Sequence, residues 1–183
     1  MRHHTRNDEA IVLKSKNISE ADKLFWVLSK NFGLLLLRAK GIRLEQSKLR
    51  YSMQKFNLIE ISFVNGKSGL RLTGAILRFS FEEYENYKNF MVLYNLTDLL
   101  SKLLPQNEPN IEIYNLLKKI IEQFDKSISK EDELIVVARI LFYLGYLDLE
   151  RNIKTDYIKN KEEYQKLLIR VNKAIKNTNL ILE

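Results

Sequence analysis

The sequence has no cysteine, and only six of its 183 residues are glycine and two are proline. Without cysteine the chain can form neither disulfides nor thiolate metal sites. So few glycines and prolines argue against long flexible linkers. No segment approaches the roughly 18 to 20 uncharged apolar residues of a membrane-spanning helix. The N-terminal segment MRHHTRNDEA also lacks the apolar core of a secretory signal, so we expect a cytoplasmic protein.

The residues that usually carry catalysis are scarce as well. The only histidines are His3 and His4, which are adjacent in a terminal segment and too few to make a zinc site. The triplet Gly66-Lys67-Ser68 resembles the end of a phosphate-binding loop, but the glycine needed five positions earlier is replaced by Ile61. We therefore expect no enzyme, no metal and no cofactor.

Acidic residues are few in the first half of the chain. Residues 1–80 carry 15 basic and 6 acidic residues, a net charge of +9, whereas residues 81–183 have a net charge of −2. Among the acids, Glu20 and Asp22 are a close pair, which we expect to form a turn. A field of positive sign attracts polyanions, so the N-terminal half is the candidate for binding nucleic acid.

Residues 1–80 contain five short segments rich in β-branched and aromatic residues. The predicted strands are Ala10 to Lys16, Lys23 to Lys30, Gly33 to Lys40, Lys55 to Val64 and Leu70 to Phe79. In the fourth, Ile59, Ile61 and Phe63 share one face. Asn65-Gly66 is expected to form the hairpin turn that follows it. Five short strands indicate a small closed barrel of the OB type, a fold that binds oligonucleotides.

Residues 81–183 have helical patterns, so the fold class is α+β, with an OB barrel followed by an all-α domain. Residues 84–104 predict a nearly buried helix that starts with a capping box of Ser80 and Glu83 and ends before Pro105. Further helices are predicted over 111–124, from a cap at Ser129 with Asp132 to near Gly145, and from Tyr164 to Ile175.

The basic residues of the N-terminal half gather on or beside the first three predicted strands and in the segment RAKGIRLEQSKLR at 38–50. A run of charge is usually a solvated face, but a barrel has one groove over strands 2 and 3 where such residues can meet. The candidate nucleic-acid-binding cations are Lys14, Lys16, Lys23, Arg38, Lys40, Arg43, Lys48 and Arg50.

Aromatic residues near these cations are candidates for stacking on bases. Phe25 and Trp26 are neighbours on one strand, so one points inward and the other outward. Trp26 is the candidate for the site, although the sequence does not decide between the two. Tyr51 is a second candidate, and core packing is the alternative for each of them.

An ordered set of segments resembles the RecO family of bacterial recombination mediators. These segments are AIVLKS at 10–15, SEADKL at 19–24, NFG at 31–33, AKGIR at 39–43 and KFNLIEIS at 55–62. The resemblance continues through LLPQNEPNIEIYNLL at 103–117 and ARILFYLGYL at 138–147. It covers about 150 residues.

The resemblance implies a protein without enzymatic activity that binds single- and double-stranded DNA, anneals complementary strands and helps RecA to load together with RecR. It implies partners in RecR and in the C-terminal tail of single-strand-binding protein, and a nucleoid-associated location in the cytoplasm. It implies DNA contacts for Lys40 and Arg43, and a partner-binding role for Arg139. Many relatives also carry a four-cysteine zinc module, so this chain resembles a shortened member without zinc.

Two other functions remain open from the sequence. An OB module for structured RNA would share the basic barrel, and strong preference for RNA over DNA would favour it. A protein-interaction scaffold would use the same cations to bind an acidic peptide tail.

Overall fold

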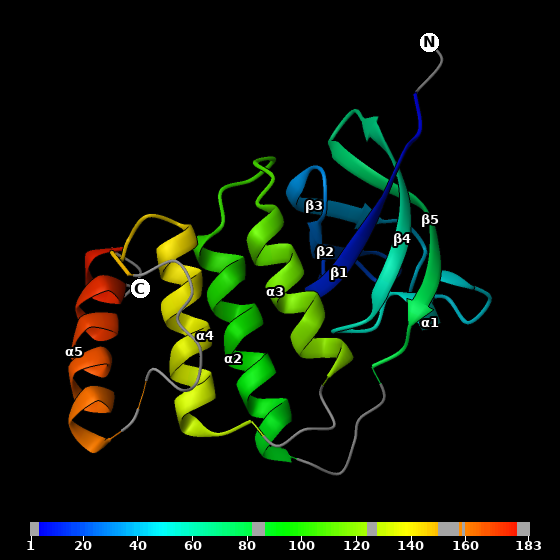
Figure 1. Cartoon of the computed structure of the whole chain (residues 1–183). Coiled ribbons are helices and arrows are strands. Elements are labelled where there is room, and N and C mark those ends of the chain that lie inside the picture. The colour runs from blue at the N-terminus through cyan, green and yellow to red at the C-terminus, as the bar shows by residue number, and fades with distance from the viewer. Residues whose placement is uncertain (1–3, 82–86, 124–127, 150–157, 159, 179–183) are drawn as a thin grey trace. The chain divides into compact units, whose positions relative to one another are not determined.

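The structure, a computed structural model, describes residues 4–81, 87–123, 128–149, 158 and 160–178. Its contacts divide the chain into two compact units (Figure 1). One contains Met1–Glu83 and Leu104–Glu122, and the other contains Tyr84–Leu103 and Gln123–Glu183. Each unit is described by itself below.

The first unit contains a closed five-stranded barrel. Its elements are β1 (Arg6–Asn17), β2 (Lys23–Ser29), β3 (Gly33–Ala39), the short helix α1 (Leu49–Ser52), β4 (Leu58–Gly66), β5 (Gly69–Phe79) and α3 (Ile111–Glu122). The strand order around the barrel is β1-β2-β3-β5-β4, with β3 and β5 parallel and the other pairs antiparallel. This arrangement confirms the predicted OB-like barrel.

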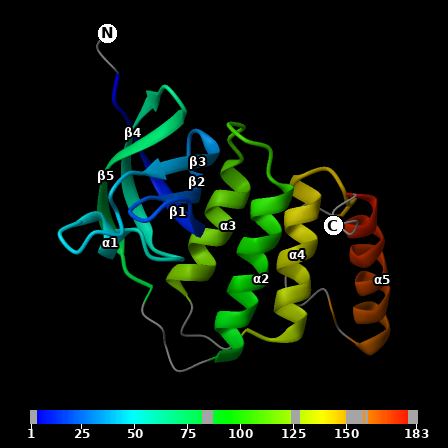
Figure 2. The ribbon, with the colours of Figure 1, turned by 180° about the vertical axis from the view of Figure 1, so that it is seen from behind.

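Alternation along the strands determines which residues fill the barrel. Ile59, Ile61 and Phe63 of β4 are buried in its core, as their spacing predicted. Phe25 of β2 also points into this core. Outward-facing residues such as Ile11 and Leu28, which pair across β1 and β2, are fully buried too. Helix α3 lies beside these two strands in both views (Figures 1 and 2).

The hairpin between β4 and β5 differs from the sequence-based prediction. Asn65 and Gly66 belong to β4, and the two-residue turn is Lys67-Ser68. The last pair of the hairpin is Gly66 with Gly69, and the positive φ of +100° occurs at Gly69. The Asn-Gly turn was wrong because the strands continue pairing past it, which moves the position that requires glycine to the far side of the turn.

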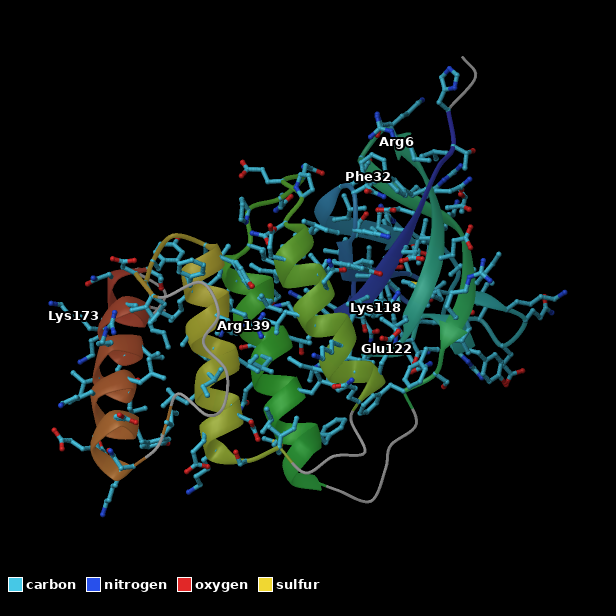
Figure 3. All side chains as sticks on the ribbon, in the orientation of Figure 1. Arg6, Phe32, Lys118, Glu122, Arg139 and Lys173 are labelled. Carbon is cyan, nitrogen blue, oxygen red and sulfur yellow. The ribbon has the colours of Figure 1, made fainter. Side chains whose placement is uncertain are left out.

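Helix α3 is tied to the barrel through one carboxylate of β1. The hydroxyl of Tyr114 donates to Glu9 Oε2 at 3.4 Å, and Lys118 Nζ lies 3.7 Å from the same oxygen. Lys30 Nζ, from the end of β2, also lies 3.7 Å from it. Burial and the charge of Glu9 raise the pKa of Tyr114 well above its usual value, so its hydroxyl remains a donor. Figure 3 shows Lys118 and Glu122 on α3.

The segment before α3 passes very close to the start of β3. Asn107 N–H donates to the carbonyl of Leu34 at 3.1 Å. A Cβ at Gly33 would lie 2.1 Å from the carbonyl oxygen of Glu108, and Gly33 has a φ of +71°. Only glycine fits this position, because both the space and the backbone conformation exclude a side chain.

The second unit contains the helices α2 (Tyr87–Leu103), α4 (Lys130–Tyr143) and α5 (Lys161–Asn177). Its core is made by residues such as Leu103, Ala138 and Leu167. Ser129 and Asp132 form the predicted capping box of α4, with Asp132 N–H donating to Ser129 Oγ at 3.0 Å. The expected cap of Ser80 with Glu83 lies outside the described residues.

The burial of α2 and the grouping of α3 both differ from what the sequence pattern of the helical half predicted. Helix α2 is not nearly buried, because Met91 and Tyr94 are exposed on one face. The sequence-based division at residue 80 also did not anticipate that α3 is grouped with the barrel. An amphipathic stripe predicts that a helix packs against something, but not which partner it packs against.

Candidate nucleic-acid interface

The turn between β1 and β2, residues 18–22, is built by its own polar groups. Ile18 N–H donates to the carbonyl of Asp22 at 3.2 Å, and Asp22 N–H donates to Ser19 Oγ at 3.1 Å. Serine and aspartate suit such a turn because their short side chains reach neighbouring backbone groups. Asp22 was expected to form this turn, but its carboxylate does more than that.

Asp22 holds two other elements with its two carboxylate oxygens. Oδ2 accepts from Arg38 Nε at 3.2 Å and from Arg38 NH2 at 2.8 Å. Oδ1 accepts from the N–H of Gly41 at 2.9 Å. The Gly41 N–H, and then the Arg38 guanidinium, hold the pKa of Asp22 below its ordinary value of 3.8. The carboxylate is therefore charged at neutral pH.

Arg43 reaches the same turn without losing its charge. Its main-chain N–H donates to the carbonyl of Ala21 at 3.0 Å, and its NH1 donates to the carbonyl of Ser19 at 2.8 Å. Carbonyl groups are neutral, so the guanidinium keeps its full positive charge and further N–H donors. Residues 40–43 are thus fixed to the 18–22 turn with a cation at each end.

Two depressions are lined by residues that flank this turn or bind to it. The first depression, about 330 Å³ in volume, is lined by the cations Lys23, Arg43 and Arg50 together with Asn17, Phe25, Ile42, Met53 and Gln54. The second depression, about 710 Å³, is lined by the cations Arg38, Lys40, Lys67 and Arg71 and by Val64, Asn65, Gly66, Ser68, Gly69 and Leu70. The two depressions are the candidate nucleic-acid interface.

The second depression contains two cations that were not predicted. Lys67 comes from the β4–β5 turn, and Arg71 stands beside Arg38 in the parallel pairing of β3 with β5. Like charges side by side repel each other, so such a cluster favours an anion between them. The sequence signal for Lys67 is the GKS triplet at 66–68, which resembles the end of a phosphate-binding loop. Strand β5, not a helix, follows it.

The remaining predicted residues are placed elsewhere on the barrel. Lys14 Nζ lies 4.9 Å from the centre of the Trp26 ring, on the surface of β1 and β2. Trp26 is half-buried and faces outward, whereas Phe25 is 1% exposed. Lys16 and Lys48 are exposed and line neither depression. The structure thus brings together five of the eight predicted cations.

Tyr51 is the more accessible aromatic residue. It lies on α1, is 70% exposed, and has the Arg50 guanidinium 5.7 Å from its ring centre. Tyr51 thus lies next to Arg50, which lines the first depression. Helices α1 and α3 are on opposite sides of the barrel in both views (Figures 1 and 2). None of the residues that line the first depression belongs to α3.

Arg139, the candidate of the helical half, lies on α4 (Figure 3). Its NH2 donates to the hydroxyl of Tyr143 at 3.2 Å, and the guanidinium is 5.9 Å from the centre of that ring. Its buried Nε has no hydrogen-bond partner within the described part of the chain.

Neither a metal cluster nor a membrane helix is found in the described ranges. No three His, Asp or Glu side chains there converge as a metal site would require. His4 is exposed, and His3 lies outside those ranges. No described helix is long and apolar enough to cross a membrane.

Comparisons with known proteins identify two modules in the chain. A family model described as "Recombination protein O N terminal" matches residues 1–81, and one described as "Recombination protein O C terminal" matches residues 84–165.

Three proteins called "DNA repair protein RecO" illustrate the similarity. The one from Thermodesulfovibrio yellowstonii is 33% identical over 159 residues, which cover 85% of this chain and 64% of the relative. Those from Caldanaerobacter subterraneus subsp. tengcongensis and Syntrophobacter fumaroxidans are 27% and 25% identical, over 76% and 81% of this chain and 58% and 60% of the relatives. The chain thus spans about six tenths of the length of these relatives.

The two modules follow each other in one chain, and the barrel carries the ordered segments in which the resemblance was seen. The relatives align with most of this chain. The sequence therefore belongs to the RecO family of DNA repair proteins.

Proposed function

We propose that the cationic depressions of the barrel bind the phosphate backbone of DNA, single- or double-stranded, and that the protein thereby anneals complementary strands. The observation that carries the proposal is that seven cations from separate elements line these two depressions. Contacts to phosphates carry no sequence information, so binding has little sequence preference.

Annealing follows from the same electrostatics. Two DNA strands repel each other through their phosphates, and a cationic surface that holds both reduces this repulsion. Base pairing then supplies the free energy. The reaction breaks no covalent bond, so it requires neither a catalytic residue nor a nucleotide as fuel.

Stacking on Tyr51 supplies the part of the affinity that depends on unpaired bases. An exposed ring beside a cationic depression can stack on a base whose phosphates are bound nearby. Every base has a flat face, so this contact tolerates any sequence. It favours single strands over duplexes, because paired bases are already stacked.

Arg139 is proposed to bind a carboxylate of a partner protein. Arg139 is half-buried on α4, and a carboxylate oxygen is the acceptor that a guanidinium prefers. The acidic C-terminal tail of single-strand-binding protein is such a partner, as the family resemblance implies. Binding this tail brings the barrel to coated single strands, and RecR and RecA act in the same proposed pathway.

The test is the salt dependence of binding to single-stranded oligonucleotides. With about five phosphates contacted, log K falls with log salt at a slope of roughly −3.5. Changing Lys40→Gln and Arg43→Gln together flattens the slope by about 1.4. The matched control is Lys161→Gln with Lys173→Gln on α5, which removes the same charge from the other unit.

An unchanged slope in the Lys40/Arg43 variant would remove these residues from the site. A strong preference for single-stranded RNA of equal length would favour the RNA-binding function instead. Binding of an acidic peptide but not of DNA would favour the protein scaffold.

A further inference from the structure

We propose that Asp22 is a positioning residue for DNA binding: this acidic side chain raises the affinity of the barrel for a polyanion by fixing the cations around it. The inference rests on the proposed function of the two depressions. It concerns a residue that contacts no phosphate itself and whose charge has the wrong sign for one.

Asp22 binds one residue that lines the second depression and one that lies in the chain between residues of both depressions. Arg38, which it binds through Oδ2, lines the second depression. Gly41, which it binds through Oδ1, lies between Lys40 of the second depression and Ile42 and Arg43 of the first. The Asp22 side chain is 8% exposed, against 46% for Arg38. The carboxylate is thus inside the surface and the guanidinium outside.

The bond to Gly41 determines the course of residues 40–43. Gly41 has a φ of +68°, a conformation at which the chain turns sharply. Three hydrogen bonds join this segment to the 18–22 turn: Gly41 N–H to Asp22 and, from Arg43, one to Ala21 and one to Ser19. Only the first uses a charged acceptor, which makes it the strongest of the three.

Removing the Asp22 carboxylate has opposite expected effects on DNA affinity, depending on whether the carboxylate acts only through its charge or also by positioning the cations. If the carboxylate acted only through its charge, replacing Asp22 with a neutral residue would strengthen DNA binding, because the net charge of the surface would become more positive by one unit. If the carboxylate preorganises the cations, its loss weakens binding, because Lys40, Arg38 and Arg43 must then be ordered when DNA binds.

Asparagine cannot replace this carboxylate. The structure uses both oxygens of Asp22 as acceptors, for Arg38 on one side and Gly41 on the other. An amide has one acceptor oxygen and an NH2 group that is a donor. Whichever way the side-chain amide of an Asp22→Asn variant faces, one of the two partners meets a donor, so either Arg38 or the 40–43 segment is released.

The experiment compares Asp22→Asn with Glu20→Gln in the full chain. Both remove one negative charge from the same turn, and Glu20 is exposed. Binding of a labelled oligothymidylate is measured by fluorescence anisotropy over a series of salt concentrations. We expect E20Q to bind as tightly as the wild type or more tightly, with the same slope.

For D22N we expect weaker binding despite the higher net charge. Each phosphate contact that is lost weakens binding about fivefold at 0.1 M salt and flattens the slope by about 0.7. A lower fraction of folded protein would raise the apparent Kd by the same factor at every salt concentration and leave the slope unchanged, so the slope separates positioning from general destabilisation.

The inference is overturned if D22N binds at least as tightly as E20Q with the wild-type slope. In that case the proposed function stands, provided that the wild type itself shows salt-dependent binding. Absence of such binding in the wild type would instead refute the proposed function.

A second variant covers the case in which D22N does not fold. Ser19→Ala removes the acceptor of the Asp22 N–H without changing the charge of the protein. We expect it to weaken binding and flatten the slope in the same direction as D22N. Wild-type affinity and slope in a folded S19A protein would contradict the inference.

Discussion

The side chains of Trp26 and Tyr51 differ in how accessible their rings are to a DNA base. Each ring has a cation nearby, Lys14 at 4.9 Å from the Trp26 ring centre and Arg50 at 5.7 Å from that of Tyr51. The two differ in exposure, because Trp26 is half-buried and Tyr51 is 70% exposed. At the scale of single residues, accessibility rather than ring type decides which aromatic residue suits DNA.

Tyr51→Ala should weaken binding of single-stranded DNA by roughly 1 to 3 kcal/mol, the usual effect of removing one stacked base. Tyr51→Phe should retain most of the affinity, because the ring remains. Fluorescence anisotropy with the same oligothymidylate measures both. Tyr146→Ala, which removes an exposed tyrosine of the other unit, is the control. Equal affinities of Y51A and wild type would exclude stacking on this residue.

The charge of Asp22 gives a pH dependence of stability with a definite sign. Its pKa is lowered in the folded protein, first by the Gly41 N–H and then by Arg38. The stabilisation is therefore complete above the ordinary pKa of 3.8 and is lost as the pH falls through the folded value.

The difference in urea midpoint between wild type and Asp22→Asn should stay constant between about pH 5 and 8 and shrink below about pH 4. Comparing the two proteins cancels the titration of the other carboxylates. A difference that remained constant down to about pH 2 would show that the ion pair contributes no stability.

Individual elements were predictable where a repeated pattern specified them. The alternation of β4 identified Ile59, Ile61 and Phe63 as core, and the Ser129 cap fixed the start of α4. The hairpin turn was misplaced because its position depends on how far two strands pair. Lys67 and Arg71 were missed for the same reason, since their meeting with Arg38 requires the pairing of β3 with β5.

Gly33 allows an element-scale prediction about the segment that leads into α3. Gly33→Ala should destabilise the protein by about 2 kcal/mol or more, because the new Cβ adds a clash with the Glu108 backbone to the strain of a positive φ. Gly145→Ala is the matched control, with a φ of +78° and no atom within 4 Å of its Cβ.

Urea unfolding of both variants measures the two effects separately. The cost in G145A is that of the backbone strain alone. A Gly33→Ala variant no less stable than G145A would show that the 104–110 segment can move away from β3 at little cost.

On the scale of the whole molecule, the order of elements in the chain differs from their grouping in space. The chain changes unit near residues 83, 103 and 122, so α3 belongs with strands that end at Phe79. Sequence patterns gave the helix but not its partner, because the buried stripe of α3 is apolar and fits many surfaces. The fold class was therefore predictable, whereas the grouping of α3 with the barrel in space was not.

Leu117→Ala on α3 should lower the stability of the barrel, while Leu167→Ala on α5 should not. Both leucines are 2% exposed, so each truncation should cost its own unit about 2 to 5 kcal/mol. Trp26, the only tryptophan, reports on the barrel by fluorescence, and far-UV circular dichroism reports mainly on the helices. Equal shifts of the fluorescence midpoint in both variants would contradict the division into units.

The return of the chain to the barrel also sets an order of events during synthesis. When β5 has left the ribosome, all five strands are present, but α3, which is grouped with them, has not yet been made. The chain must first synthesise α2. Until Lys118 emerges, Glu9 of β1 lacks the contacts that Tyr114 and Lys118 provide, and a chaperone could bind the incomplete unit during this interval.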